Sequence, residues 1–218
     1  MKSIPSGSID AIITDPPYGT TSCKWDSVID FDLMWEQLNR IIKPNGAIVL
    51  FGSEPFSSAL RMSNIKNYKY DWIWQKTQPT GFLNAKKMPL KQFEVISVFY
   101  RKLPTYNPQL TDKKPENIRK LSKNIKAKES ENYGKYKRSD DFRIIPIDKT
   151  YPRDVLNFKN SNIKKKQHPT QKPVSLMEYL IKTYTNENET VLDFTMGSGS
   201  TMVACQNTNR NGIGIEQD

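Results

Sequence analysis

A short motif near the amino terminus combines an acidic group, two prolines, an aromatic ring and a glycine: Asp15, Pro16, Pro17, Tyr18 and Gly19. It directly follows an apolar, β-branched run at residues 9–14, which is typical of a buried strand in a parallel sheet. Proline fixes φ and donates no backbone N–H, so two prolines in a row end the strand and leave carbonyl oxygens free. The Asp15 carboxylate and the Pro16 carbonyl are therefore expected to form two rigid acceptors beside the Tyr18 ring.

Two acceptors beside an aromatic face suit a planar ring that carries an exocyclic amine. The lone pair of such a nitrogen is delocalised into its ring, which makes the nitrogen a weak nucleophile. Acceptors placed on its N–H bonds would stabilise the charge that develops as the nitrogen attacks, while Tyr18 stacks on the ring. The alternative is an ordinary turn after a strand, which Asp-Pro-Pro by itself fits equally well.

A glycine-rich turn near the carboxyl end could bind a second ligand. Gly197 and Gly199 lie between an apolar strand expected at 190–194 and a helix running to about residue 206. Glycines let a ligand approach the backbone, and the N–H groups at a helix start favour a negative group. The next strand, at 212–215, leads to Glu216, whose carboxylate can accept hydrogen bonds from both hydroxyls of a ribose. With Asp193 before the turn, this pattern predicts a nucleoside-containing cofactor, with a structural turn as the alternative. The full Gly-x-Gly-x-x-Gly pattern is absent, which argues against a nicotinamide or flavin cofactor.

Alternating strands and helices are expected to position both motifs. Apolar spacing predicts helices at 32–42, from about 55 to 62 and after Pro173. It predicts further strands at 47–51, 70–75 and 93–100, with a long loop at 76–90. This alternation predicts an α/β fold with a doubly wound sheet of about six mostly parallel strands and one unprotected edge. Ligands of such sheets bind beyond the carboxyl ends of the strands, where Asp15 would lie.

The composition limits the class of protein. The chain has 218 residues and a net charge of +10, and it contains no run of eighteen apolar residues. We therefore expect a soluble, cytoplasmic protein that does not contact a membrane. The two cysteines, Cys23 and Cys205, lie in unrelated contexts, so neither a disulfide framework nor a metal site is expected.

The excess positive charge lies in one segment, residues 102–166. This segment holds 18 Lys and Arg against 8 Asp and Glu, whereas the rest of the chain holds 15 of each. Its aromatic residues are Tyr106, Tyr133, Tyr136, Phe142, Tyr151 and Phe158. Lysines that attract phosphates, mixed with rings that stack on bases, predict a nucleic-acid contact; a solvated lysine-rich insertion is the alternative. Within the segment we expect a short helix at 116–126 and some order at 142–147 and 151–158. The only histidine, His168, follows the segment and fits either a structural residue or a base.

Taken together, these motifs resemble those of the S-adenosylmethionine-dependent DNA amino-methyltransferases. Residues 15–18 are similar to the catalytic Asp/Asn/Ser-Pro-Pro-Tyr/Phe motif of that family, and residues 193–199 are similar to its cofactor loop. The order of catalytic strand, basic insertion, His-Pro-Thr-Gln-Lys-Pro and cofactor loop resembles the permuted beta group. The resemblance implies a Rossmann-like methyltransferase sheet, with a catalytic half at 1–101, an inserted target-recognition region at 102–166 and a cofactor-binding half at 167–218.

The resemblance also implies the role of each site residue. Asp15, Pro16 and Pro17 would bind the target amine, and Tyr18 would stack on a base flipped out of the duplex. The implied contacts of S-adenosylmethionine are Asp193, Phe194, Thr195, Gly197, Ser198, Gly199, Thr201 and Glu216, with Lys172 and Pro173 closing over it from the other side. The family pattern usually reads Asp-Pro-Phe-x-Gly-x-Gly. Here Phe194 takes the proline position and Thr195 the phenylalanine position, so we expect the aromatic cofactor contact to be shifted or weakened.

The substrate that the resemblance implies is double-stranded DNA, methylated at adenine N6. Cytosine N4 is the near alternative, because the same acceptors serve either amine. A truncated, non-catalytic DNA-binding remnant, or methylation of RNA or of a protein glutamine, are further alternatives. The resemblance also admits two protein partners: a second copy of the chain in a homodimer, and a cognate restriction endonuclease.

Overall fold

The computed structural model describes residues 1–20, 26–118, 145–146, 148–160 and 171–216. It divides the chain into two compact units, one formed by Met1–Asn107 with Arg153–Asp218 and the other by Pro108–Pro152. The second unit is therefore shorter than the insertion expected at 102–166. His168 and most of the helix expected at 116–126 lie outside the described residues.

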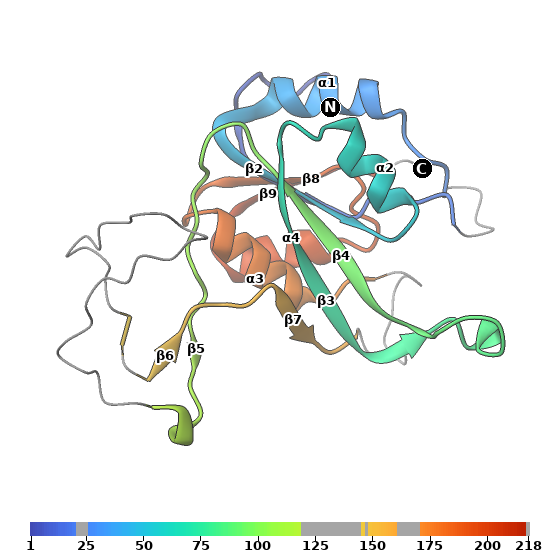
Figure 1. Ribbon diagram of the computed structural model, residues 1–218. Coiled ribbons are helices and arrows are strands. Elements are labelled where there is room, and N and C mark those ends of the chain that lie inside the picture. The colour runs from blue at the N-terminus through green and yellow to red at the C-terminus, as the bar shows by residue number, and fades with distance from the viewer. Residues whose placement is uncertain (21–25, 119–144, 147, 161–170, 217–218) are drawn as a thin grey trace, which may run out of the picture. The chain divides into compact units, whose positions relative to one another are not determined.

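The first unit is built on a seven-stranded sheet (Figure 1). In spatial order its strands are β7 (Val155–Phe158), β3 (Tyr68–Thr80), β4 (Lys91–Phe99), β2 (Ile42–Gly52), β1 (Ile9–Thr14), β8 (Thr190–Asp193) and β9 (Asn211–Gly214). Every neighbouring pair is parallel except the two that involve β4, which runs antiparallel to both β2 and β3. The expected α/β fold with a mostly parallel sheet is thus confirmed, with one strand more than the expected six.

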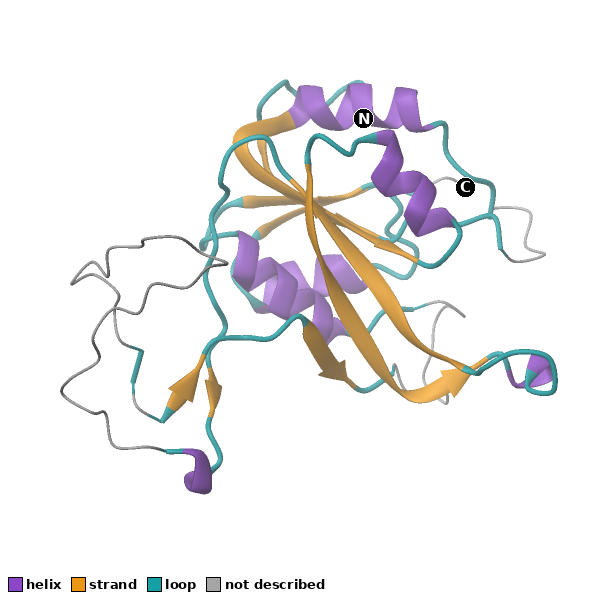
Figure 2. Ribbon diagram, viewed as in Figure 1, coloured by secondary structure: helices purple, strands orange, loops and turns teal. Residues whose placement is uncertain are grey.

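Helices cover both faces of this sheet (Figure 2). They are α1 (Phe31–Ile41), α2 (Phe56–Ser63), α3 (Val174–Tyr184) and α4 (Ser200–Asn207). Successive side chains of a strand point to opposite faces. In β1, Ile12 packs in the cluster formed with α1 and α2, whereas Ile13 packs in the cluster formed with α3 and α4. The apolar run of β1 is continuous because both of its faces are buried. No helix among the described residues is long and apolar enough to cross a membrane.

The hairpin of β3 and β4 differs from the expectation. The loop predicted at 76–90 is too long, because β3 continues to Thr80 and a short 3₁₀ helix, η1 (Phe82–Asn84), follows. The chain then returns as β4, which lies between β3 and β2. The connection at 81–90 is too short for the crossover that joins parallel neighbours, so β4 runs antiparallel to β3. Consequently, the carboxyl end of β3 and the amino end of β4 lie at the same edge of the sheet.

The seventh strand comes from the segment that was expected to be an insertion. β7 pairs in parallel with β3, with Ile73 opposite Val155 and Lys76 opposite Phe158. Leu156 of this strand is 6% exposed and belongs to the cluster under α3. Residues 155–158 therefore extend the catalytic sheet.

The second unit contains a two-stranded antiparallel ladder of β5 (Thr111–Asp112) and β6 (Lys149–Thr150). An ion pair between Lys149 and Asp112 joins the two strands. A single 3₁₀ turn, η2 (Pro115–Asn117), lies where the expected helix would begin.

The buried Tyr184 supplies a test of how α3 is held to β3. Its hydroxyl accepts a hydrogen bond from Trp72 Nε1 at 2.7 Å and lies 2.9 Å from the Tyr70 hydroxyl. Tyr184→Phe leaves the buried Trp72 N–H without an acceptor, which costs about 1–3 kcal/mol of the free energy of unfolding. Urea denaturation measures this loss. Tyr106→Phe is the control, because Tyr106 packs on Tyr184 but is 43% exposed. Equal losses in the two variants would contradict the prediction.

Candidate active site

Parallel pairing of β1 with β8 joins the two motifs. Ile12 lies opposite Leu192, so both strands end side by side at the same edge of the sheet. Beyond that edge, Thr195 Oγ1 donates to the carbonyl oxygen of Asp15 at 3.0 Å, and Thr14 Oγ1 donates to Asp193 Oδ1 at 2.6 Å. Residues 180 positions apart in the chain are thereby in direct contact.

Asp193 organises the glycine-rich turn. Its carboxylate is 4% exposed; Oδ1 accepts from the Thr14 hydroxyl and from Thr195 N at 3.2 Å, and Oδ2 accepts from the Thr201 hydroxyl. Burial raises the pKa of Asp193, and these three hydrogen bonds lower it without cancelling the effect of burial. Both carboxylate oxygens thus have protein donors from β1, the turn and α4.

The turn itself leaves room for a ligand. Gly197 and Gly199 have positive φ angles of +50° and +74°, and no atom lies within 4 Å of a Cβ built on either residue. Gly197 N donates to Glu216 Oε2 at 2.6 Å, which holds the turn to the segment after β9. The ring of Phe194 is 7% exposed and packs in the cluster of α1 and α2. A ring at this position is therefore part of the core, and the expected change in the aromatic cofactor contact stays a prediction.

A carboxylate that was not expected to matter fixes the loop after β1. Asp26 accepts three backbone N–H groups, from Tyr18 at 2.7 Å and from Gly19 and Thr20 at 2.9 Å. The Tyr18 ring lies against Phe56 of α2, with 5.1 Å between ring centroids. The backbone and the ring of Tyr18 are thus both fixed, which holds the loop that carries Asp15.

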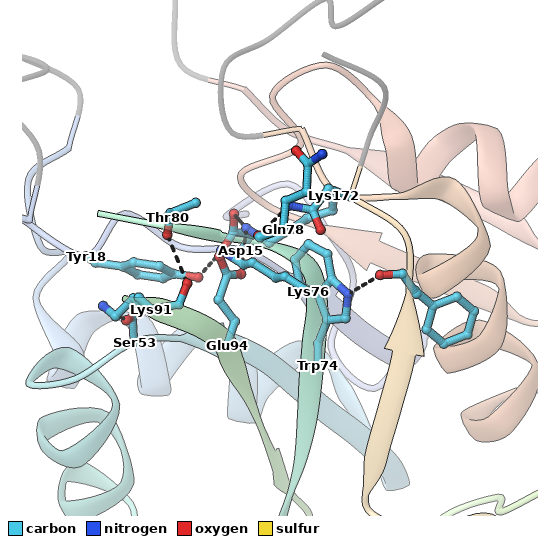
Figure 3. A network of polar contacts seen from close by, with 12 residues as sticks. Asp15, Tyr18, Ser53, Trp74, Lys76, Gln78, Thr80, Lys91, Glu94 and Lys172 are labelled. Carbon is cyan, nitrogen blue, oxygen red and sulfur yellow. Dashed lines mark hydrogen bonds and ion pairs between the residues drawn. The ribbon is translucent and has the colours of Figure 1, made fainter. Parts of the chain in front are cut away.

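The side chain of Asp15 is the centre of a buried polar network (Figure 3). Tyr18 donates its hydroxyl hydrogen to Asp15 Oδ1, and Lys172 Nζ donates to Asp15 Oδ2. Lys172 Nζ also lies 3.3 Å from Glu94 Oε2, while Lys76 Nζ lies 2.5 Å from Glu94 Oε1. The network therefore alternates two carboxylates with two ammonium groups, contributed by the β1 loop, β3, β4 and the residue two positions before α3.

Burial and charge act against each other in this network. Burial raises the pKa of Asp15, and the Lys172 ammonium only partly offsets this increase. Burial also opposes ionisation of Glu94, but Lys172 and Lys76 outweigh it and leave its pKa below the usual range. For Lys172, burial favours the neutral amine, yet Asp15 and Glu94 raise its pKa overall. Lys172 and Glu94 are thus held in their charged forms. Asp15, by contrast, takes up a proton more readily than an ordinary aspartate does.

Sequence reasoning located most of the grouped residues but missed three charged ones. Lys172 and Pro173 were expected at the cofactor, whereas Lys172 contacts Asp15, and the buried Pro173 accepts backbone N–H groups at the start of α3. The missed residues are Lys76, Glu94 and Asp26. Glu94 could have been found as the one acidic residue of β4, directly before the mostly apolar residues 95–99. The cofactor contacts implied by the resemblance stay predictions.

The fold and the joined motifs define an α/β methyltransferase. A family model described as DNA methylase (N6_N4_Mtase) matches residues 9–218. The chain belongs to this family.

Individual relatives show the same relationship. The type II methyltransferase M.HpaI of Haemophilus parainfluenzae is 30% identical over 99% of this chain, which spans 66% of that relative's length. The crystal structure of an M1.HpyAVI–SAM complex is similar over 100% of this chain and 86% of that one, with a TM-score of 0.60 and 28% identity. PvuII DNA methyltransferase, described as cytosine-N4-specific, shares the fold at 17% identity with a TM-score of 0.66, covering 100% of this chain and 78% of its own.

The Thr201 hydroxyl provides a test of how Asp193 is held. Thr201→Val removes the donor to Asp193 Oδ2 and leaves a buried carboxylate oxygen unpaired, at a cost of about 1–3 kcal/mol at neutral pH. The bond favours the carboxylate and lowers its pKa, so the loss shrinks as the pH falls through the pKa of Asp193, which burial holds above 3.8, the ordinary value for an aspartate.

Chemical denaturation at several pH values measures this dependence. Thr208→Val is the matched control in the turn that ends α4, because its hydroxyl donates to backbone carbonyls and to no carboxylate. A Thr201→Val loss that does not depend on pH would show that Asp193 does not rely on this donor.

Proposed function

We propose that this chain is a DNA methyltransferase that transfers a methyl group from S-adenosylmethionine to the exocyclic amine of a flipped base. The observation that carries the proposal is the contact between the two loops, in which the Thr195 hydroxyl donates to the Asp15 carbonyl. It brings an acceptor carboxylate next to a glycine-rich turn with open space. One solved relative is a complex with S-adenosylmethionine, which supports the same cofactor for this chain.

The residues of the turn fit such a cofactor. Open space above Gly197 and Gly199 leaves their backbone accessible to the methionine end, and the exposed Glu216 is near enough to Gly197 to serve the ribose. Asp193 would shape this turn through its hydroxyl partners. The cofactor would supply a methyl group on a positively charged sulfur, which keeps the electron pair when its bond to carbon breaks.

The residues after β1 would prepare the nitrogen. Asp15 and the Pro16 carbonyl accept its two N–H bonds, and Tyr18 stacks on the base. As the C–N bond forms, the nitrogen would pass one proton to the Asp15 carboxylate, from which it reaches water, and would become a neutral methylated amine. Since the chemistry needs no covalent enzyme intermediate, much of the rate depends on holding the nitrogen in line with the methyl carbon. A base within a duplex cannot reach these residues, so it has to be flipped out.

We propose adenine N6 as the target atom and keep cytosine N4 as the alternative. The aspartate form of the motif resembles the adenine enzymes more often, but two oxygen acceptors serve either amine. Incubating the protein with S-adenosylmethionine and mixed genomic DNA, followed by digestion to nucleosides and mass spectrometry, separates N6-methyladenine from N4-methylcytosine. Absence of both products, with S-adenosylmethionine still bound in calorimetry, would leave a non-catalytic DNA-binding protein.

The hairpin of β3 and β4 supports contact with DNA. It projects beyond the sheet and carries η1 near its tip (Figure 1). From residue 72 to residue 93 the sequence has four lysines and no acidic residue. Phe82 and Leu83 at the tip are 76% and 85% exposed. Apolar side chains next to lysines suit contact with a duplex. The apolar side chains can enter a groove, and the ammonium groups can contact phosphates.

The remaining partners are proposals of the same kind. We propose that residues 102–166, which hold the entire net charge of +10, help to recognise the target sequence. A homodimer and a cognate restriction endonuclease stay predictions from the resemblance.

The carboxylate of Asp15 is expected to be essential for transfer. Asp15→Ala removes the side-chain acceptor and should lower kcat at least about a hundredfold, while calorimetry should give an unchanged Kd for S-adenosylmethionine. Asp32→Ala, an exposed change on α1, is the control. The proposed role is wrong if Asp15→Ala methylates DNA as fast as the control.

The lysines of the hairpin are expected to contact phosphates. The double change Lys86→Ala and Lys87→Ala should weaken DNA binding and reduce the slope of log K against log salt concentration by about 2. Fluorescence anisotropy across a salt series measures this slope. The control removes two exposed lysines before and within the start of β3, Lys66→Ala and Lys69→Ala. An identical slope for both double variants would exclude the hairpin from the DNA contact.

A further inference from the structure

Both oxygens of the Asp15 carboxylate already have donors. Tyr18 donates to Oδ1 and Lys172 to Oδ2. The proposed function, on which this inference rests, requires an oxygen of Asp15 to accept a hydrogen bond from the target amine. A carboxylate oxygen can accept two donors, so the amine either shares an oxygen with a protein donor or takes the place of one.

Of the two donors to Asp15, Lys172 has a second acceptor nearby. Its Nζ lies 3.3 Å from Glu94 Oε2. That oxygen is buried and makes no hydrogen bond within the part of the chain that the structure describes, whereas Oε1 of the same carboxylate is paired with Lys76. A small shift of the ammonium toward Glu94 would satisfy the unpaired oxygen and free Asp15 Oδ2.

The network can accommodate this shift without a change in net charge. Asp15 and Glu94 balance Lys172 and Lys76, so the cluster is neutral whether Lys172 lies on one carboxylate or the other. The ammonium would also stay desolvated, because Lys172 is 9% exposed and lies over the Phe51 ring at 5.2 Å. An anionic oxygen would face the cation in both positions, so neither position leaves a buried charge without a partner.

We propose that Lys172 is a positioning residue that occupies the place of the target amine on Asp15 and moves to Glu94 when the base binds. An ammonium group presents N–H donors as the amine does, so it keeps Oδ2 directed and hydrogen-bonded in the free protein. It also keeps the carboxylate ionised until the base arrives. Without it, burial would favour the protonated acid, which has lost an acceptor.

A purely neutralising lysine would behave differently. If Lys172 only balanced the charge of Asp15, loss of the Glu94 charge would leave Asp15 better ionised and binding of the base no weaker. If Lys172 moves to Glu94 when the base binds, loss of the Glu94 charge keeps Lys172 on Asp15 and weakens binding of the base. The Glu94→Gln variant therefore separates the two roles.

The test is the pH dependence of kcat/KM for DNA in three variants. Among the described residues, the titratable groups that act on Asp15 are Tyr18, Glu94, Lys172 and Asp193, and Lys76 is linked to it only through Glu94. Lys172→Met should move the acid limb of the profile to higher pH, because the cation that favours the carboxylate is gone. Glu94→Gln should move the limb to lower pH and yet raise KM for DNA by about tenfold, with the Kd for S-adenosylmethionine unchanged. Lys76→Met is the matched control: it removes an equally buried ammonium that does not touch Asp15 and should shift the limb less than Lys172→Met.

A second measurement does not depend on turnover. Carbon-13 NMR of labelled aspartate carboxyl groups, assigned by comparison with Asp15→Asn, follows the titration of Asp15 in the free protein. The pKa of Asp15 should rise in Lys172→Met and fall in Glu94→Gln. Absence of methyl transfer by the unaltered protein would overturn the proposed function, and the NMR titration would still test the paired arrangement. Methyl transfer with a Glu94→Gln variant whose KM for DNA is unchanged would overturn the role of Lys172 alone.

Discussion

The parallel pairing of β1 with β8 is the constraint on which the site depends. Its register, with Ala11 opposite Val191 and Ile12 opposite Leu192, makes both strands end at one edge, where Asp15 and Asp193 emerge. Hydroxyl groups of Thr14 and Thr195 then join the two loops. Because helices cover both faces of the sheet, the strands are buried, and slippage by one residue would turn their apolar side chains to the wrong face. The precision of the site thus follows from the packing of the core.

Charge balance is the second constraint. A carboxylate that accepts hydrogen bonds from a substrate has to be desolvated, and desolvation favours its protonated form. Here two lysines and a second carboxylate surround Asp15, so the buried cluster has no net charge and each ion has a partner. Within the described part of the chain, Oε2 of Glu94 makes no hydrogen bond, although the Lys172 ammonium lies 3.3 Å from it. In a buried network such an oxygen is costly, which makes it a candidate for a second position of the lysine.

The antiparallel hairpin links the catalytic edge to the surface that we assign to DNA. Lys76 on β3 and Glu94 on β4 reach the cluster, and the connection between these two strands carries the exposed Phe82 and Leu83 in η1. Under the proposed function, the hairpin is both a wall of the site and a contact surface for DNA.

The sequence alone determined the local elements and predicted the chemistry of the two motifs. A continuous apolar run before Asp-Pro-Pro-Tyr specified β1, helical spacing specified α1, and a glycine-rich turn after a strand indicated the start of α4. These signals depend on neighbouring residues only. Tertiary structure decided the rest. The direction of β4, the pairing of β7 with β3 and the partner of Lys172 all depend on contacts between distant segments. No local pattern encodes which strand a segment will pair with, and a lysine next to a proline fits a cofactor contact as well as an ion pair. Lys172 is paired with a residue 157 positions away because the fold brings the start of α3 to the end of β1.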